Sequence, residues 1–176
     1  MSYQSLIQGW HDFYIIAGTA SATLVGLLFV GLSLHLRAVL SRSEVRSLAR
    51  VTLTNFGLLL FISLFIVVPQ GPSGVTLQLL ISGALSVAII VPSLLAAAGS
   101  ETRTLRLPQL VVRFGLSLLS YAGVIVAGAL FAGASYDAAL SWLVVVTIVL
   151  LFVSLRNSWD LLVSVGAAIA ETTEWD

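Results

Sequence analysis

Side chains that could support acid, base or nucleophilic chemistry are scarce in this chain. Its 176 residues include two histidines, eight acids and no cysteine or lysine. Thiolate metal sites, cysteine nucleophiles and lysine-dependent phosphate loops are therefore excluded. His35 lies in a long apolar stretch, but no nucleophile motif and no pair of aspartates accompanies it there. We expect no catalytic residue, no cofactor-binding residue and no metal ligand.

The histidines and the nearby acid are not expected to form a site together. His11 and His35 lie roughly 36 Å apart if the stretch between them is helical, since each residue adds about 1.5 Å. His11 and Asp12 are consecutive, so we expect their side chains to point apart on a helix. Because His35 lies close to the end of its apolar stretch, it is expected to reach the lipid headgroups. An ion or proton site is the alternative.

The elements that hold these residues consist mainly of apolar sequence. Hydrophobic residues make up 59% of the chain and charged residues 9%, and the mean hydropathy is +1.07. A soluble protein usually carries about 25% charged residues, so this composition predicts an integral membrane protein. The formal net charge is zero and lysine is absent. The chain therefore lacks the basic surface that nucleic-acid binding requires.

Five apolar stretches are long enough to cross a bilayer, whose hydrocarbon core of about 30 Å needs roughly 20 helical residues. They cover approximately residues 13–36, 51–69, 75–98, 111–133 and 139–155. The sequence therefore predicts an all-α, polytopic membrane protein with five transmembrane helices, folded as a single transmembrane domain over residues 1–176.

Short interfacial helices are expected at both ends of the chain. Residues 2–11 place their large apolar side chains on one helical face, which is typical of a helix lying in the membrane interface. Asn157 is a suitable N-cap residue, so we expect a separate helix over residues 158–170. That helix is too short to span the bilayer and is expected to lie along its inner surface.

All the arginines fall on one side of this five-span arrangement. They are Arg37, Arg42, Arg46, Arg50, Arg103, Arg106, Arg113 and Arg156. Because positive charge is retained in the cytoplasm, we expect the N-terminus outside and the C-terminus in the cytoplasm. An odd number of spans also places the two ends in different compartments, so the span count and the charge agree.

The first apolar stretch is unusual in its small side chains. Residues 17–23 are seven small residues in succession, and Gly18, Ala22 and Gly26 repeat at the spacing of close helix packing in membranes. A surface that faces lipid has no need of such residues. We expect this helix to be central and enclosed by its neighbours. The alternative is a helix that lines a hydrated path or a subunit interface.

A heptad-spaced seam on the same helix favours that alternative. The seam includes Thr19, Thr23, Gly26, Ser33 and Arg37, whose spacing places them along one side of a left-handed packed helix. In a homo-oligomer these residues could line a pore. A ring of Arg37 at the inner mouth of that pore would favour anions.

Two further polar groupings suggest contacts between helices. Asn55 lies with Thr52 and Thr54 near the inner end of the second span, and we interpret this cluster as a source of interhelical hydrogen bonds. Arg156 and Asp160 are one helical turn apart and are predicted to pair, docking the last helix on the bundle.

One segment resembles a known family. The run Trp10-His-Asp-Phe-Tyr14, followed by Gly18-Thr-Ala-Ser-Ala-Thr-Leu-Val-Gly-Leu-Leu-Phe-Val30, is similar to a family of small, mostly uncharacterised bacterial inner-membrane proteins. Some members are labelled as modulators of a membrane protease. The resemblance implies a multi-pass protein of the bacterial inner membrane, and it brings no catalytic motif.

These observations favour a non-enzymatic integral membrane protein that acts as a homo-oligomer or as a subunit of a membrane complex. Its expected partners are the lipid bilayer, further copies of itself or another membrane protein. A homo-oligomeric ion channel or small transporter, with the first helix lining the pore, is the first alternative. A regulator of a membrane enzyme such as a protease is the second.

Overall fold

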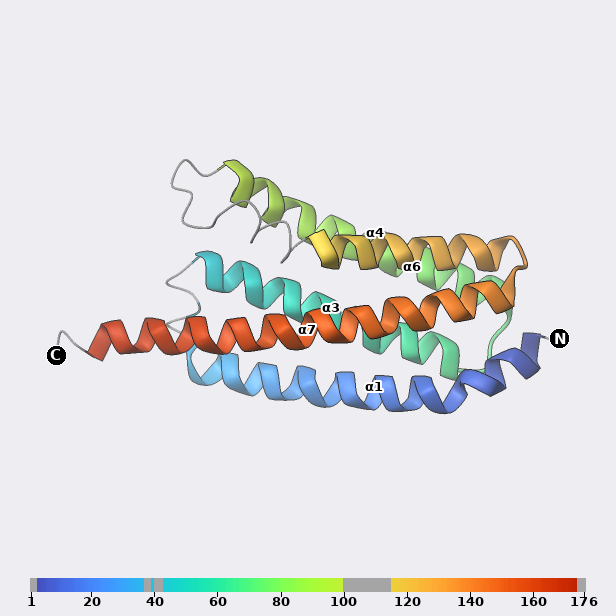
Figure 1. The fold of residues 1–176 in the computed structure, drawn as a ribbon, viewed down its shortest axis with the longest axis horizontal. Coiled ribbons are helices and arrows are strands. Elements are labelled where there is room, and N and C mark those ends of the chain that lie inside the picture. The colour runs from blue at the N-terminus through green and yellow to red at the C-terminus, as the bar shows by residue number, and fades with distance from the viewer. Residues whose placement is uncertain (1–2, 37–38, 40–42, 100–114, 174–176) are drawn as a thin grey trace.

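The computed structural model describes residues 3–36, 39, 43–99 and 115–173 of the chain, and in these ranges it contains helices and no strand. The helices are α1 (Tyr3–Leu34), α3 (Ser43–Val67), α4 (Pro72–Gly99), α6 (Leu116–Ala132) and α7 (Tyr136–Thr173) (Figure 1). The predicted all-α fold is therefore confirmed.

The helices lie side by side and run alternately in opposite directions, so the two ends of the chain lie at opposite ends of the bundle (Figure 1). Helix α1 forms one edge, α4 and α6 form the other, and α3 and α7 lie between them. This order is the one expected when successive membrane-spanning helices are joined by short connections.

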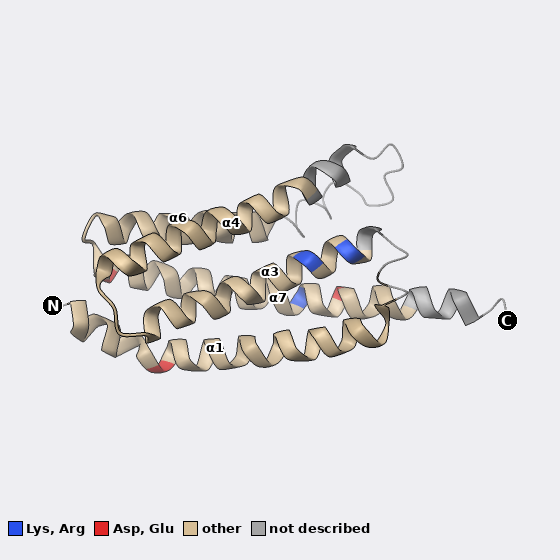
Figure 2. Ribbon diagram, turned by 180° about the vertical axis from the view of Figure 1, so that it is seen from behind, with Lys and Arg blue, Asp and Glu red and all other residues tan. Residues whose placement is uncertain are grey.

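Charge is distributed unevenly along the bundle axis (Figure 2). The arginines in the described part of the chain are Arg46 and Arg50, in the first turns of α3, and Arg156, in the C-terminal half of α7. They lie toward the end of the bundle that holds the C-terminus, which we call the arginine end. Asp12 and Asp137 lie near the starts of α1 and α7, at the opposite end.

Among the described residues, four helices are long and apolar enough to cross a membrane. These spans are Tyr3–Leu34, Val45–Val67, Pro72–Pro92 and Tyr136–Gly166. The described part of α6 is a shorter apolar helix of 17 residues, and the start of the fourth predicted span, residues 111–114, lies outside the described residues. The chain is thus a membrane-embedded helical protein.

The two short helices expected at the chain ends are continuous with the neighbouring spans. Helix α1 begins at Tyr3, and the 38-residue α7 passes through Asn157 without a break. The prediction of a separate helix capped by Asn157 is wrong, because this side chain is 1% exposed within the bundle and helical packing continues beyond it. At about 1.5 Å per residue, α7 is longer than the roughly 30 Å core of a bilayer.

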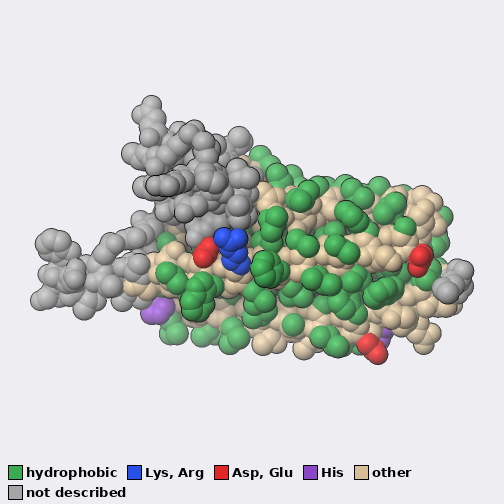
Figure 3. Space-filling model, viewed as in Figure 1, with side chains coloured by type: hydrophobic (Ala, Val, Ile, Leu, Met, Phe, Trp, Pro, Cys, Tyr) green, Lys and Arg blue, Asp and Glu red, His purple; other side chains and the backbone are tan. Residues whose placement is uncertain are grey.

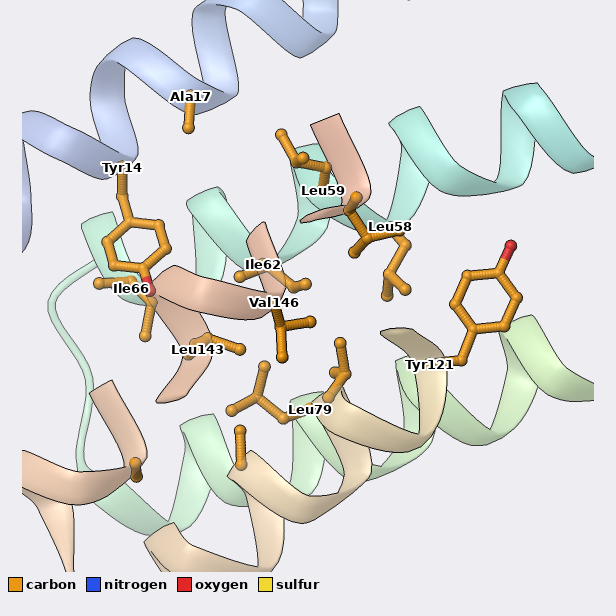
Figure 4. Close-up of a cluster of buried hydrophobic side chains, with 14 of the residues drawn as sticks. Tyr14, Ala17, Leu58, Leu59, Ile62, Ile66, Leu79, Tyr121, Leu143 and Val146 are labelled. Atoms are coloured by element: carbon orange, nitrogen blue, oxygen red, sulfur yellow. The ribbon is translucent and has the colours of Figure 1, made fainter. Parts of the chain in front are cut away.

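The interior consists of two apolar clusters. The main cluster, part of which is drawn in Figure 4, is built from all five helices. It includes Tyr14 and Ala17 from α1, Leu59 and Ile62 from α3, Leu79 from α4, Tyr121 from α6, and Leu143 and Val146 from α7. A smaller cluster at the arginine end joins Val39, Val45, Leu48, Ala49, Leu161 and Val165, with Leu28 and Leu32 packed against it. The second cluster holds the extended part of α7 against the start of α3.

Candidate functional site

Helix α1 lies at the edge of the bundle and offers most of its surface to the surroundings. Along its whole length the buried residues are Tyr14, Ala17, Gly18 and Ser21, all on the face toward α3 and α7. The expectation of a central helix enclosed by its neighbours is therefore wrong for a single chain. The physical reason is that residues 17–23 are small on every face of α1, so their types do not indicate which face is buried. Helices α3 and α7 contact only one side of α1.

The close contact between α1 and α3 depends on Gly18. A Cβ atom built on Gly18 would lie 2.8 Å from the Cβ of Ser63, closer than two such atoms can approach. Three residues farther along, Ser21 donates a hydrogen bond from its Oγ to the carbonyl oxygen of Phe56 at 2.6 Å. Small side chains at positions 18 and 21 thus bring the two backbones together.

The other members of the predicted close-packing series face outward. Ala22 and Gly26 are exposed, and a Cβ atom built on Gly26 would meet no heavy atom within 4 Å. Of the three residues at this spacing, Gly18 is the one that packs within the chain. Because their side chains are small, Ala22 and Gly26 form a shallow strip on the exposed surface of α1, which we call the strip.

The heptad seam coincides with this strip. Thr19, Thr23, Gly26 and Ser33 are all exposed, while Arg37 lies outside the described residues. Thr23 donates its hydroxyl to the carbonyl oxygen of Thr19, and Ser33 donates to that of Val30, both at 2.9 Å. The hydroxyl protons of Thr23 and Ser33 are therefore satisfied inside α1, so these two side chains need no further polar partner in lipid.

Large apolar side chains lie both beside the strip and within it. Leu27 and Phe29 lie beside the seam, whereas Ile16 and Val30 occupy heptad positions of the seam itself, and all four are more than half exposed. Figure 3 shows hydrophobic side chains spread over the visible face of the bundle, with few charged groups among them. The exposed side of α1 therefore combines a short run of small residues, from Thr19 to Gly26, with larger apolar side chains on either side and at both ends of that run.

A buried polar contact joins α3 to α6. Asn55 donates from its Nδ2 to Ser117 Oγ at 3.0 Å and accepts at its Oδ1 from the hydroxyl of Tyr121 at 2.5 Å. All three side chains are fully buried. The interpretation of Asn55 as a source of interhelical hydrogen bonds is confirmed, although its partners are 62 and 66 residues away in sequence. These hydrogen bonds link α3 to α6 inside the bundle.

The end of α7 docks on the bundle through apolar side chains. Leu161 and Val165 pack in the cluster that contains Val45 and Leu48 of α3. Sequence reasoning missed these residues, although their spacing of four along a long apolar helix was the available signal. Arg156 is exposed and Asp160 is half-buried, one turn apart on α7. Their pairing remains a prediction.

The opposite end of the bundle contains exposed polar groups. His11 Nδ1 lies 3.6 Å from Asp12 Oδ1, so the expectation that these side chains point apart is wrong, because neighbouring exposed side chains can turn toward each other. A contact of this kind between exposed side chains contributes little stability. An open depression lies between Leu6 and residues 134–138, and its titratable side chains are Tyr136 and Asp137. His35, past the end of α1, is also exposed.

No group of three or more histidine, cysteine or acidic residues that could hold a metal occurs in the described ranges. The exposed strip of α1 is a feature of the described structure that packing within the chain does not explain. Comparison with protein-family models, with curated proteins and with solved structures finds no match to this chain.

Proposed function

We propose that this protein acts through association of its transmembrane helices rather than through catalysis, as a homo-oligomer or as a subunit of a membrane complex. The observation that supports this proposal is the exposed strip of small residues on α1. The partner we favour is a second copy of the chain, contacting α1 with its own α1.

The argument rests on what drives helix association in lipid. Lipid chains are as apolar as leucine, so two helices gain by close van der Waals packing, and small residues permit that approach. Gly26 and Ala22 lie on a side of α1 that faces away from α3 and α7. Large apolar residues would serve equally well against lipid alone. Small residues at these positions favour a helix as the neighbour.

The geometry of the strip suits a parallel pair. All copies of a chain insert in the same orientation, so α1 of one copy would meet α1 of the next in parallel. Spacings of four and three from Thr19 through Thr23 and Gly26 match a left-handed crossing of about 20°. In that arrangement the two Gly26 residues would lie near the point of closest approach.

The experiment compares Gly26→Leu with Ala20→Leu in the full-length protein. Both residues are exposed on α1, but Ala20 lies outside the seam, so the two variants add similar volume to different faces. We expect Gly26→Leu to weaken association about tenfold, which corresponds to about 1.4 kcal/mol, while Ala20→Leu has little effect. Energy transfer between labelled copies in liposomes measures the equilibrium. A wild-type protein that is strictly monomeric, or two variants with equal effects, would contradict the proposal.

A homo-oligomeric channel is the second candidate, favoured by the hydroxyl-bearing seam. If several copies of α1 surrounded an axis, the oxygen atoms of Thr19, Thr23 and Ser33 would face the centre, with Arg37 near one mouth. Thr23→Leu would then reduce ion flux through liposomes, and Arg37→Glu would invert its anion preference. An ion flux that neither substitution changes would contradict the channel proposal.

We also infer that the arginine end faces the cytoplasm of a bacterium and that the N-terminus lies outside the inner membrane. The support is the collection of Arg46, Arg50 and Arg156 at one end of the bundle, since positive residues are retained on the cytoplasmic side.

A further inference from the structure

Helix α7 presents a second organised surface, separate from the strip on α1. Phe152, Leu155, Arg156 and Trp159 follow the spacing i, i+3, i+4 and i+7, which places them on one helical face. The exposed fractions of the three large apolar side chains are 66% for Phe152, 50% for Leu155 and 68% for Trp159, and Arg156 is exposed as well. The opposite face of α7 is the one that packs on the bundle.

The order of these side chains along α7 follows the change of polarity across one leaflet of a bilayer. Phe152 and Leu155 lie toward the middle of the bundle, where acyl chains surround a membrane protein. Arg156 follows, and Trp159 lies one turn nearer the arginine end. Indole rings and arginine side chains favour the headgroup level of a membrane. This face can therefore contact both the chains and the headgroup of one lipid.

The local charge selects the kind of headgroup. Arg156 is the cation of this face of α7, and Asp160 lies one turn beyond it on the same helix. A guanidinium group binds phosphate with paired, charge-assisted hydrogen bonds. The positive charge of Arg156 therefore attracts a lipid with net negative charge more strongly than a zwitterionic one.

We propose that Phe152, Leu155, Arg156 and Trp159 form a binding site for an anionic phospholipid. Arg156 contacts the phosphate, the acyl chains cover Phe152 and Leu155, and the Trp159 indole lies beside the glycerol region. A soluble anion would leave the apolar half of the site uncovered. The exposed Leu162 and Val163 continue the apolar surface of α7 past Trp159, so a protein partner on this face is one of the outcomes that the test distinguishes.

The test uses Trp159 as a local reporter in the full-length protein, with Trp10, Trp142 and Trp175 replaced by Phe. The protein is reconstituted in phosphatidylcholine vesicles that contain brominated phosphatidylglycerol or, at the same mole fraction, brominated phosphatidylcholine. Bromine quenches indole fluorescence on contact, so the quenching curves give the relative affinity of the two lipids at this site. We expect a preference of about fivefold for phosphatidylglycerol, the effect of one cation near an anionic headgroup.

Two variants separate the site from the general charge of this end. Arg156→Gln should abolish the preference, whereas Arg46→Gln, which removes the same charge from α3, should preserve most of it. Because Trp142 donates a hydrogen bond to the Gly123 carbonyl, its replacement could disturb folding. Native mass spectrometry of phosphatidylglycerol retained by the four-tryptophan protein, with and without Arg156→Gln, therefore provides a second measurement.

Several results would overturn the proposal. Equal quenching by the two lipids would exclude a preference for the anionic lipid. An equal loss of that preference in Arg156→Gln and Arg46→Gln would attribute it to the overall charge of this end rather than to the site. Release of brominated phosphatidylglycerol by inorganic phosphate would indicate a site for a soluble anion. A change of oligomeric state in Arg156→Gln, with the lipid preference unchanged, would assign this face to a protein contact.

Discussion

Tyr121 of α6 donates its hydroxyl to the Oδ1 of Asn55 on α3 at 2.5 Å, and neither side chain is exposed. The same amide donates to Ser117, so one asparagine uses both its oxygen and its nitrogen to link two helices. In an apolar bundle the alternative to this contact is a set of unpaired polar groups, which is unfavourable.

The first prediction follows from this contact. Asn55→Ala removes two interhelical hydrogen bonds and should lower the free energy of unfolding by about 1–3 kcal/mol, because the Tyr121 and Ser117 hydroxyls lose a buried partner. Tyr121→Phe removes one bond and should cost less, near the average of about 0.6 kcal/mol for such bonds in membranes. Reversible unfolding in mixed detergent micelles measures both.

Thr54→Val is the control for that series. The Thr54 hydroxyl bonds within its own helix to the Arg50 carbonyl, so its loss should have a small effect. A destabilisation by Thr54→Val as large as that by Asn55→Ala would show that the link between α3 and α6 has no special weight.

The second prediction concerns the approach of α1 to α3. Gly18→Ala places a methyl group against Ser63, with a Cβ–Cβ distance of 2.8 Å, and should cost about 1–3 kcal/mol, the usual penalty of overpacking. Ser63→Gly in the same chain should restore part of the loss, because it removes the atom with which the methyl group collides.

Gly26→Ala serves as the comparison for Gly18→Ala. The space above Gly26 is open, and alanine favours a helix more than glycine does, so this change should leave the stability of the single chain equal or higher. If Gly18→Ala were also harmless, α1 would not be packed on α3 through this contact.

The third prediction concerns membrane orientation. Reporters that are active in one compartment, inserted at Gly74 and at Asp176, should report opposite sides of the membrane, with Gly74 outside and Asp176 in the cytoplasm. Both the alternating direction of the helices and the placement of the arginines lead to this result. Detection of both reporters in the same compartment would contradict the five-span arrangement.

The fourth prediction concerns the extension of α7. Leu161 is 1% exposed and Leu162 is 61% exposed, so these neighbours form a matched pair. Leu161→Ala should cost about 2–5 kcal/mol and increase hydrogen exchange in the last turns of α7, because the contact with α3 is weakened. Leu162→Ala should change little. Similar exchange in the two variants would show that α7 is not held by the apolar cluster.

The prediction from sequence was accurate where local composition decides the outcome. Long apolar stretches with short polar connections determine which residues become helices and that successive helices run in opposite directions, since a bilayer leaves the backbone few other ways to satisfy its hydrogen bonds. Asn55 was also identified as an interhelical donor, because an amide inside an apolar helix needs a partner.

Which face of each helix is buried was decided by the tertiary structure. Residues 17–23 are small on every face of α1, so the sequence is compatible with contacts on any side. The positions of α3 and α7 decide that Ala17 and Ser21 are buried and that Thr19 and Gly26 are exposed. Asn157 looked like a cap because its type suits a helix start, but Leu161 and Val165 continue the packing on α3 and keep α7 unbroken. Helix formation depends on neighbours a few residues apart, whereas packing depends on residues that the folded chain brings together from far apart.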